Sequence, residues 1–285
     1  MPQVSINGMA LNYQRRPGSG PDVVLVHGFA TNLAFWFFRI APLLARNFRL
    51  TMYDLRGHGQ SDMPPSGYTT DDMAADLHGL LDRLEIRRVH LVGHSYGGAV
   101  ALHYTVLHPE RVTSLTLADS RIRAFQPTQR LADWPHADVW RSKLKELAPS
   151  NSLDDLEMGH QVLEVLAEAK IQGKELTNTA DGVFSPFGFS SRTAERWLQL
   201  LRTTTARSDF TAIAGLTSEK ISQVNCPVLA LFGEFSPCLP SCNELRQHLF
   251  SCRVVIVPRS GHFHPMVKPA FFTRNLRKFL REVPA

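Results

Sequence analysis

Residues 89–104 read VHLVGHSYGGAVALHY, and this stretch decides the fold. A short apolar run ends at Gly93, and the pattern that follows is helical until it stops before Pro109. Between them, residues 93–97 fit the pattern G-x-S-x-G. The glycines let the chain turn sharply, so that Ser95 takes a strained backbone conformation and its hydroxyl is lifted clear of the sheet. We therefore predict a strand, a tight turn with a reactive serine, and a helix; the alternative is that Ser95 is an ordinary turn residue.

Short apolar, β-branched runs recur along the chain, and helical patterns separate them. Most of these runs lack strict polar alternation, which is typical of strands buried on both faces of a parallel sheet. The alternation of strand and helix predicts one doubly wound α/β sheet, preceded by a hairpin with Asn7-Gly8 as its two-residue turn. The expected strands are residues 23–27, 49–54, 89–93, 112–119, 227–233 and 253–258, and the expected helices are residues 69–84, 96–108 and 271–280.

Residues 120–223 interrupt this rhythm with helical and loop patterns. Apolar residues recur at helical spacing in residues 162–169 and 193–201, and Ser152-x-x-Asp155 looks like a capping box. We interpret residues 120–223 as a helical lid inserted into an α/β core of residues 1–119 and 224–285, because ligands bind beyond the carboxyl ends of such strands. The alternative is a helical subdomain without a role at the site.

Composition and charge exclude several classes of protein. Of the 285 residues, 44% are hydrophobic and 20% are charged, which is ordinary for a globular protein with a sizeable core. The formal net charge of +5 is spread along the chain, without the basic and aromatic stripe of a nucleic-acid-binding protein. No signal-peptide pattern or membrane-spanning apolar run is present. We expect a cytoplasmic protein with a small-molecule substrate and no nucleic-acid or membrane partner; its oligomeric state stays open.

The four cysteines, Cys226, Cys238, Cys242 and Cys252, all fall in the last quarter of the chain. A structural zinc site usually shows paired C-x2-4-C knuckles, and only Cys238 and Cys242 are close in sequence. We therefore expect buried thiols in a reducing compartment. Because no phosphate-binding or dinucleotide-binding glycine pattern occurs either, we expect neither a metal nor a cofactor.

The expected strand at residues 23–27 leads into His27-Gly28-Phe29. A flexible turn at this point brings the backbone N–H of Phe29 beside that of Tyr96, at the start of the helix after Ser95. Unpaired N–H groups at a helix N-terminus can hold a developing negative charge. We predict that these two donors form an oxyanion hole, in which each donor is worth about 3–4 kcal/mol. We expect His27 to brace the loop.

Four motifs follow one another along the chain: His27-Gly28, then DLRGHG at residues 54–59 with Ser61-Asp62, then GHSYGG at residues 93–98, then Gly261-His262. In this order they resemble the α/β-hydrolase fold superfamily over nearly the whole chain outside the lid. The resemblance implies a mostly parallel central sheet flanked by helices. It implies Ser95 as nucleophile, His262 as general base, and Phe29 and Tyr96 as oxyanion hole, with Asp54 and Arg56 in a structural loop.

The same resemblance favours His262 over its neighbour His264 as the base, which would take the Ser95 proton and return it to the leaving group. A metal-binding pair made of His262 and His264 is the weaker alternative.

The acid that should orient the histidine is ambiguous. Many relatives carry an aspartate three residues after a glycine in the loop that corresponds to residues 233–236, but here that position is Ser236. Asp119 ends the strand after the nucleophile, as in some relatives, and Glu234 lies in the usual loop but two residues early. We favour Asp119 as the acid and keep Glu234, or an unusual site without an acid, as alternatives. Asp119 could also simply cap the turn into the lid.

The default reaction is hydrolysis of an ester, thioester or lactone through a Ser95 acyl-enzyme. The protein would then be a carboxylic-ester hydrolase of class EC 3.1. Aromatic residues after the oxyanion loop and in the lid suggest a pocket for a fairly hydrophobic small molecule, although some must belong to the core. The pocket candidates are Trp36, Trp134, Trp140 and Phe187.

Two other functions stay open. The fold also hosts cofactor-independent oxygenases of heteroaromatic rings, whose acid follows the earlier strand as Asp119 does. A ligand-binding protein on a hydrolase scaffold is the other alternative, and the serine at position 236 gives it mild support.

Overall fold

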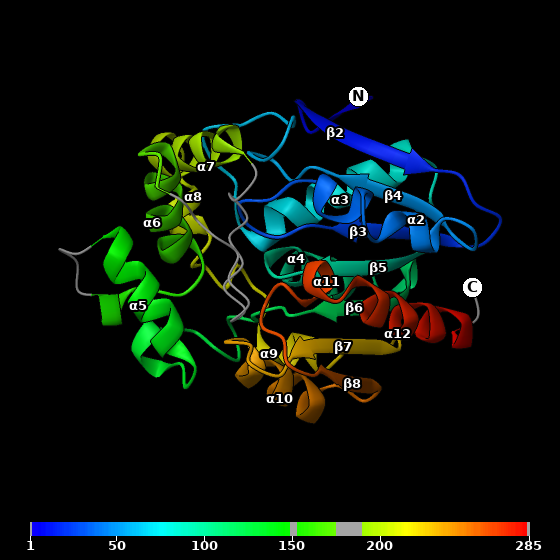
Figure 1. Ribbon diagram of the computed structural model, residues 1–285. Coiled ribbons are helices and arrows are strands. Elements are labelled where there is room, and N and C mark those ends of the chain that lie inside the picture. Colours follow the sequence, from blue (N-terminus) through cyan, green and yellow to red (C-terminus); the bar gives the residue numbers. More distant parts are fainter. Residues whose placement is uncertain (1, 149–152, 175–189, 284–285) are drawn as a thin grey trace.

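The structure, a computed structural model, describes residues 2–148, 153–174 and 190–283. Within this part of the chain, eight strands form one sheet in the order β1-β2-β4-β3-β5-β6-β7-β8 (Figure 1). Each strand expected from the sequence is present, with its ends within one residue of the expected ones. The strands are β1 (Gln3–Ile6), β2 (Met9–Arg16), β3 (Asp22–Val26), β4 (Arg49–Tyr53), β5 (Val89–His94), β6 (Val112–Ala118), β7 (Val228–Gly233) and β8 (Cys252–Val257).

The sheet is antiparallel at one edge and parallel elsewhere. Asn7 and Gly8 form the two-residue turn between β1 and β2, and both have positive φ angles, 51° and 79°, as this kind of hairpin turn requires. β2 also runs antiparallel to β4, whereas all pairs from β4 through β8 are parallel. Parallel neighbours need crossover connections, and helices supply them.

Helices cover both faces of the sheet (Figure 1). In the described part of the chain none of them combines the length and apolar character that crossing a membrane requires. The helices are α1 (Ala34–Phe37), α2 (Ala41–Leu44), α3 (Thr70–Arg83), α4 (Tyr96–Leu107), α5 (Ala137–Leu147), α6 (His160–Ile171), α7 (Ser191–Thr203), α8 (Ala206–Asp209), α9 (Ser218–Ile221), α10 (Leu239–His248), α11 (His264–Val267) and α12 (Pro269–Glu282).

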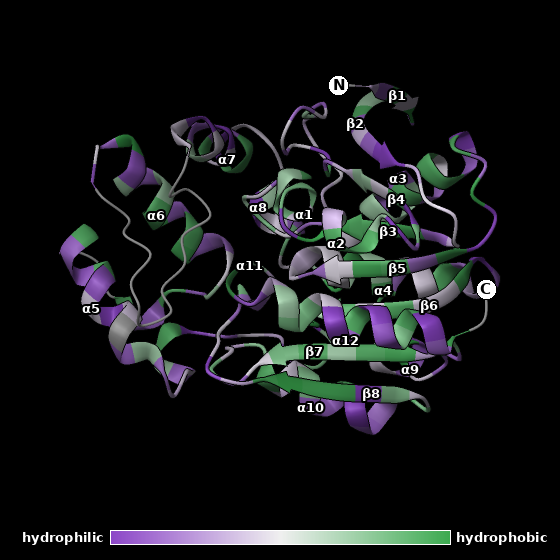
Figure 2. Cartoon of the chain, turned by 45° about the vertical axis from the view of Figure 1, so that its right-hand side comes forward, coloured by the Kyte–Doolittle hydropathy of each residue, from purple (hydrophilic) through white to green (hydrophobic). Residues whose placement is uncertain are grey.

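Alternate residues of the central strands enter two different cores. In β7, Val228, Ala230 and Phe232 join the core shared with α3, α4 and α10, while Leu229 and Leu231 join the core under α12. Both sets are apolar because both faces of the strand are covered. Figure 2 shows the result: β7 is largely hydrophobic along its length, whereas α12 carries hydrophilic as well as hydrophobic residues.

The segment between β6 and β7 lies at the carboxyl ends of the strands, where α5, α6, α7 and α8 gather at the left of Figure 1. The expected helical patterns appear as α6 and α7, and α5 is an additional helix. The expected capping box at Ser152 falls outside the described residues. Trp197 of α7 and Phe210, just after α8, anchor this segment on the core, because their rings pack at 5.5 Å and 4.3 Å from the ring of Phe29.

A buried ion pair joins the loop after β4 to α3. The Nε and Nη2 atoms of Arg56 donate to the two carboxylate oxygens of Asp76 at 2.6 and 2.5 Å. Asn7 of the hairpin turn also donates to Asp76, at 3.4 Å. Thr69 and Asp72 start α3 with a reciprocal capping box.

We expect Asp76→Asn to destabilise the protein by about 3–5 kcal/mol, because it leaves the Arg56 charge buried without its partner. Urea unfolding followed by circular dichroism measures this. Asp71→Asn, an exposed carboxylate on the same helix, is the matched control and should change the free energy of unfolding by less than about 0.5 kcal/mol. Equal stabilities of the two variants would contradict the prediction.

Candidate active site

Ser95 lies at the sharp turn between β5 and α4. Its φ of 55° and ψ of −126° are strained for a residue with a side chain, and such strain concentrates at functional sites. The turn is possible because glycines permit close approach: a Cβ atom on Gly97 would lie 2.2 Å from the carbonyl oxygen of His27, and one on Gly28 would lie 2.7 Å from Cβ of Ser95. The chain after β3 therefore lies directly against the serine.

The imidazole of His262 faces Ser95. Its Nε2 lies 2.9 Å from Oγ of Ser95, and its Nδ1 lies 2.9 Å from Oδ1 of Asp119. The loop that carries His262 follows β8 and is held by two other histidines. Nε2 of His94 donates to the carbonyl of His262 at 3.0 Å, and Nε2 of His264 donates to the carbonyl of Leu231 at 3.1 Å. Burial lowers the pKa of His264 to about 4, so His264 stays neutral and braces the loop.

Asp119 follows the last residue of β6 and is completely buried. Besides the contact with His262, its Oδ2 accepts a hydrogen bond from the backbone N–H of Gly233 at 2.7 Å, and its Oδ1 accepts one from the hydroxyl of Ser236. Burial alone would raise the pKa of Asp119, but the hydrogen bond and charge of His262 outweigh it, so the pKa lies below its ordinary value. The φ of 53° at Asp119 makes it a second strained residue at a strand end.

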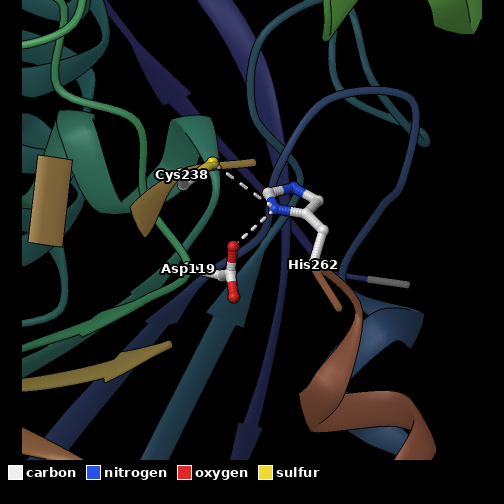
Figure 3. A group of neighbouring side chains, drawn as sticks. All are labelled: Asp119, Cys238 and His262. Atoms are coloured by element: carbon white, nitrogen blue, oxygen red, sulfur yellow. Dashed lines mark hydrogen bonds and ion pairs between the residues drawn. The ribbon is translucent and has the colours of Figure 1, made fainter. Parts of the chain in front are cut away.

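The charge on Asp119 acts in turn on His262. Burial opposes a charged imidazolium, but Cys238 and Asp119 outweigh it and raise the pKa of His262 above its ordinary value. Figure 3 shows the sulfur of Cys238 and the carboxylate of Asp119 facing the same ring nitrogen. The Cys238 Sγ to His262 Nδ1 distance is 3.7 Å. No pattern in the sequence placed this thiol beside the histidine, because its position depends on the path of the turn after β7.

Glu234 does not reach His262. Its carboxylate accepts a hydrogen bond from the backbone N–H of Arg259 at 2.7 Å and faces the loop after β8. Ser236, at the position where the sequence resemblance led us to look for an acid, donates a hydrogen bond to Asp119. The structure therefore brings Ser95, His262 and Asp119 together and leaves the alternative acid outside the group.

The backbone amides of Phe29 and Tyr96 belong to the two chain segments that meet at Ser95, because Gly28 lies against Ser95 and Gly97 lies against the carbonyl of His27. Among the hydrogen bonds of the described residues, none is donated by either N–H. The rings of Phe29 and Tyr96 stack at 4.3 Å, which holds the two chain segments together. His27 braces this region, since its Nε2 accepts from the N–H of Leu55 at 3.0 Å. Burial lowers the pKa of His27 to about 4 and keeps it neutral.

A cavity of about 590 Å³ opens over Ser95 and His262, between the strand ends and the inserted helices. Its wall includes both expected tryptophans of the insertion, Trp134 and Trp140, together with an apolar face of α6. The expectation for Trp36 is wrong: its side chain is completely buried in the core, where it stacks on Phe272 of α12. Phe187 lies outside the described residues.

An arginine pair at one side of the cavity is absent from the sequence predictions. Arg121 and Arg123 line the cavity and share one carboxylate oxygen of Glu157, at 2.5 and 3.2 Å. Their remaining contacts are largely with backbone carbonyls, including those of Pro127 and Phe210. The pair therefore holds the start of the insertion against α8.

A family model described as the alpha/beta hydrolase fold matches residues 21–269. The chain belongs to the α/β-hydrolase fold family. This confirms the predicted superfamily and the predicted fold, a mostly parallel sheet flanked by helices.

The relatives of this α/β-hydrolase differ in their named reactions. A protein of Bacillus subtilis (strain 168) assigned as a 2-succinyl-6-hydroxy-2,4-cyclohexadiene-1-carboxylate synthase is 26% identical over 94% of this chain and 93% of its own. A fluoroacetate dehalogenase of Burkholderia is 41% identical over 107 residues, 36% of this chain and 35% of the relative. The structure of a thermophilic esterase of Thermogutta terrifontis is 26% identical, with a TM-score of 0.67 and 100% of both chains covered. The relatives thus include hydrolases acting on different bonds.

We expect Asp119→Asn to lower kcat by about 10⁴-fold, because the amide can no longer stabilise an imidazolium or hold the correct tautomer. Glu234→Gln, the matched loss of a carboxylate from the neighbouring loop, should leave kcat within about twofold, since exposed polar contacts contribute little. Steady-state kinetics with an ester substrate compare the two variants. A larger loss in Glu234→Gln than in Asp119→Asn would reverse the assignment of the acid.

Proposed function

We propose that this α/β-hydrolase is a serine hydrolase that cleaves an ester, thioester or lactone of a fairly hydrophobic small molecule. The observation that carries the proposal is the unbroken hydrogen-bonded series from Ser95 through His262 to Asp119, which opens onto a cavity. In such a series the serine is activated by the base beside it, and the base is oriented by the buried acid.

The distances support a specific path for the proton. Nδ1–H of His262 donates to Asp119, which leaves Nε2 free to accept the hydroxyl proton of Ser95. Oγ of Ser95 then forms a bond to the substrate carbonyl carbon, and the imidazolium gives its proton to the leaving alcohol, thiol or lactone oxygen as that bond breaks. A water molecule repeats the sequence in reverse roles and releases the acid.

We assign the oxyanion hole to the N–H groups of Phe29 and Tyr96. Both adjoin Ser95, and neither donates to an acceptor within the described residues. Two such donors, fixed in place before the reaction, stabilise the charge that develops on the carbonyl oxygen by about 3–4 kcal/mol each.

The apolar lining of the cavity supports a substrate with a hydrophobic acyl or alcohol group. We propose that residues 120–223 act as a lid over this cavity. The cavity is lined by Trp134 and Trp140 and by three apolar residues of α6, Val162, Leu163 and Leu166. Such a lining binds substrate by excluding water and leaves orientation to a few polar groups. The relatives named as hydrolases support the reaction class, and we place the bond cleaved in EC 3.1.

The position of Asp119 supports a second candidate function. A carboxylate directly after β6 resembles the arrangement in cofactor-independent oxygenases of heteroaromatic rings. In that reaction His262 would remove a proton from a bound hydroxy-quinolone, and molecular oxygen would be consumed with release of carbon monoxide.

The four free thiols support, for either function, a reducing compartment such as the cytoplasm.

The proposed nucleophile predicts covalent labelling by a fluorophosphonate probe. We expect fast labelling of the wild-type protein, none of Ser95→Ala, and a rate lowered by at least about 10²-fold in Asp119→Asn. Ser222→Ala, an exposed serine after α9, is the matched control and should label like the wild type. Fluorescence of the labelled band over time gives the rates.

Absence of labelling in the wild-type protein would reject the hydrolase. Oxygen uptake with a hydroxy-quinolone would then support the oxygenase, whereas ligand binding without turnover would support a non-catalytic protein.

The apolar cavity predicts a dependence on acyl length. Across acetyl, butyryl and hexanoyl esters, kcat/KM should rise by up to roughly fourfold for each methylene, because burying one is worth about 0.8 kcal/mol. Leu163→Trp, which fills part of the cavity, should remove the gain for the longest ester, whereas Ile171→Trp on the exposed end of the same helix should not. A flat series in the wild type would contradict a hydrophobic acyl site.

A further inference from the structure

We propose that Asp119, Cys238 and His262 form a binding site for a soft divalent cation such as Zn²⁺ or Cd²⁺, which shuts off the serine when it binds. The three residues lie in different segments: Asp119 directly after β6, Cys238 directly before α10, and His262 in the loop after β8 (Figure 3). One ligand atom from each lies within 4.8 Å of the other two. Metal binding rests on these atoms alone, whereas the inhibitory effect rests on the proposed function.

The distances are close to those of a tetrahedral zinc site. Zinc lies about 2.3 Å from sulfur and about 2.0–2.2 Å from nitrogen or oxygen, so tetrahedral angles put nitrogen and sulfur about 3.6 Å apart. The observed Nδ1 to Sγ distance between His262 and Cys238 is 3.7 Å. Nδ1 and Oδ1 of Asp119 are 2.9 Å apart, because a hydrogen bond joins them, and they need to separate by about 0.5 Å once a metal replaces the proton.

The charges also fit. A carboxylate on Asp119 and a thiolate on Cys238 balance the two positive charges of the cation, so a buried site of this kind carries no net charge. Cys238 is the N-cap residue of the ten-residue helix α10, where the helix dipole favours negative charge. The mixed sulfur, nitrogen and oxygen ligand set suits zinc and cadmium better than magnesium or calcium.

The supporting contacts are already in place. The hydroxyl of Ser236 donates to Asp119 and accepts a hydrogen bond from the backbone N–H of Cys238 at 2.9 Å. One serine thus positions two of the three ligands, as outer-shell partners do in metal sites. Cys238 and His262 both line the cavity, which provides the entry path and room for a water as fourth ligand.

Binding would stop the base by moving its proton. The metal takes the Nδ1 lone pair of His262, so the ring can hold a proton only at Nε2. The proton displaced from Nδ1 goes to Nε2 or, where Nε2 already carries one, to solvent, and the thiol proton of Cys238 is released to solvent. Nε2–H then donates toward Ser95 and cannot accept the hydroxyl proton. The serine therefore loses its base while the fold stays intact.

Among the residues that the structure describes, no other cysteine belongs to a group of three potential metal ligands. Burial raises the pKa of Cys226 and Cys252 to about 11 and that of Cys242 to about 12, which keeps all three as neutral thiols at physiological pH. Among the cysteines only Cys238 and Cys242 are close in sequence, and that spacing had argued against a metal site. The ligands proposed here join Cys238 to residues 119 and 262, which no sequence spacing connects.

Titration of the purified full chain with Cd²⁺ tests the site through the ultraviolet charge-transfer band of a cadmium–thiolate bond. We expect the band in the wild type and in Cys252→Ala, but not in Cys238→Ala; both variants keep three thiols. Zn²⁺ should slow fluorophosphonate labelling of the wild type, and EDTA should restore it. In Cys238→Ala the Zn²⁺ concentration needed for half-inhibition should rise more than about tenfold, since loss of even an outer-shell partner lowers metal affinity by about that factor.

Thermal unfolding of each variant without metal confirms that it is folded. An equal cadmium band in Cys238→Ala and the wild type, or unchanged zinc inhibition in Cys238→Ala, would overturn the site. A cadmium band without any effect of zinc on labelling would overturn the inhibitory role. If the wild type never labels, the proposed hydrolase fails, but the band still decides whether the cation binds.

Discussion

The carboxylate of Asp119 is a charge with no exposed surface, and the architecture around the site depends on keeping it paired. An isolated buried carboxylate is costly, so it needs hydrogen bonds as well as a counter-charge. Gly233, Ser236 and His262 supply these contacts. They belong to the end of β7, the turn after it and the loop after β8. One buried charge therefore ties together three neighbouring segments at the carboxyl edge of the sheet and sets the orientation of the imidazole.

The same requirement explains the division of roles between Asp119 and Ser236. The register pairs Ala118 of β6 with Leu231 of β7, so the residue after Ala118 emerges beside the end of β7. A carboxylate at position 119 reaches the histidine directly, so the turn after β7 does not need to supply an acid. Position 236 in that turn holds a serine, whose hydroxyl donates a hydrogen bond to the carboxylate at the end of β6. The same turn also brings Cys238 to the histidine.

Local patterns in the sequence predicted most of the framework. Each β-branched apolar run is a strand, and the helix expected at residues 69–84 is α3, because these signals depend on neighbours within a few residues. Helix α5 was not predicted, although Trp140, Leu144 and Leu147 recur at helical spacing and could have revealed it. The assignment of Trp36 to the pocket was wrong because aromatic character alone does not say which side of the sheet a side chain faces.

The sequence by itself determined the order of strands and helices, the sharp turn at Ser95 and the family, since G-x-S-x-G between a strand and a helix is a short-range pattern. Only the tertiary structure placed Asp119, and not Glu234, against His262 and brought Cys238 beside the same ring. Those contacts join residues 24 to 143 positions apart. They depend on strand register and on the path of two turns, and no periodicity along the chain encodes such a distance.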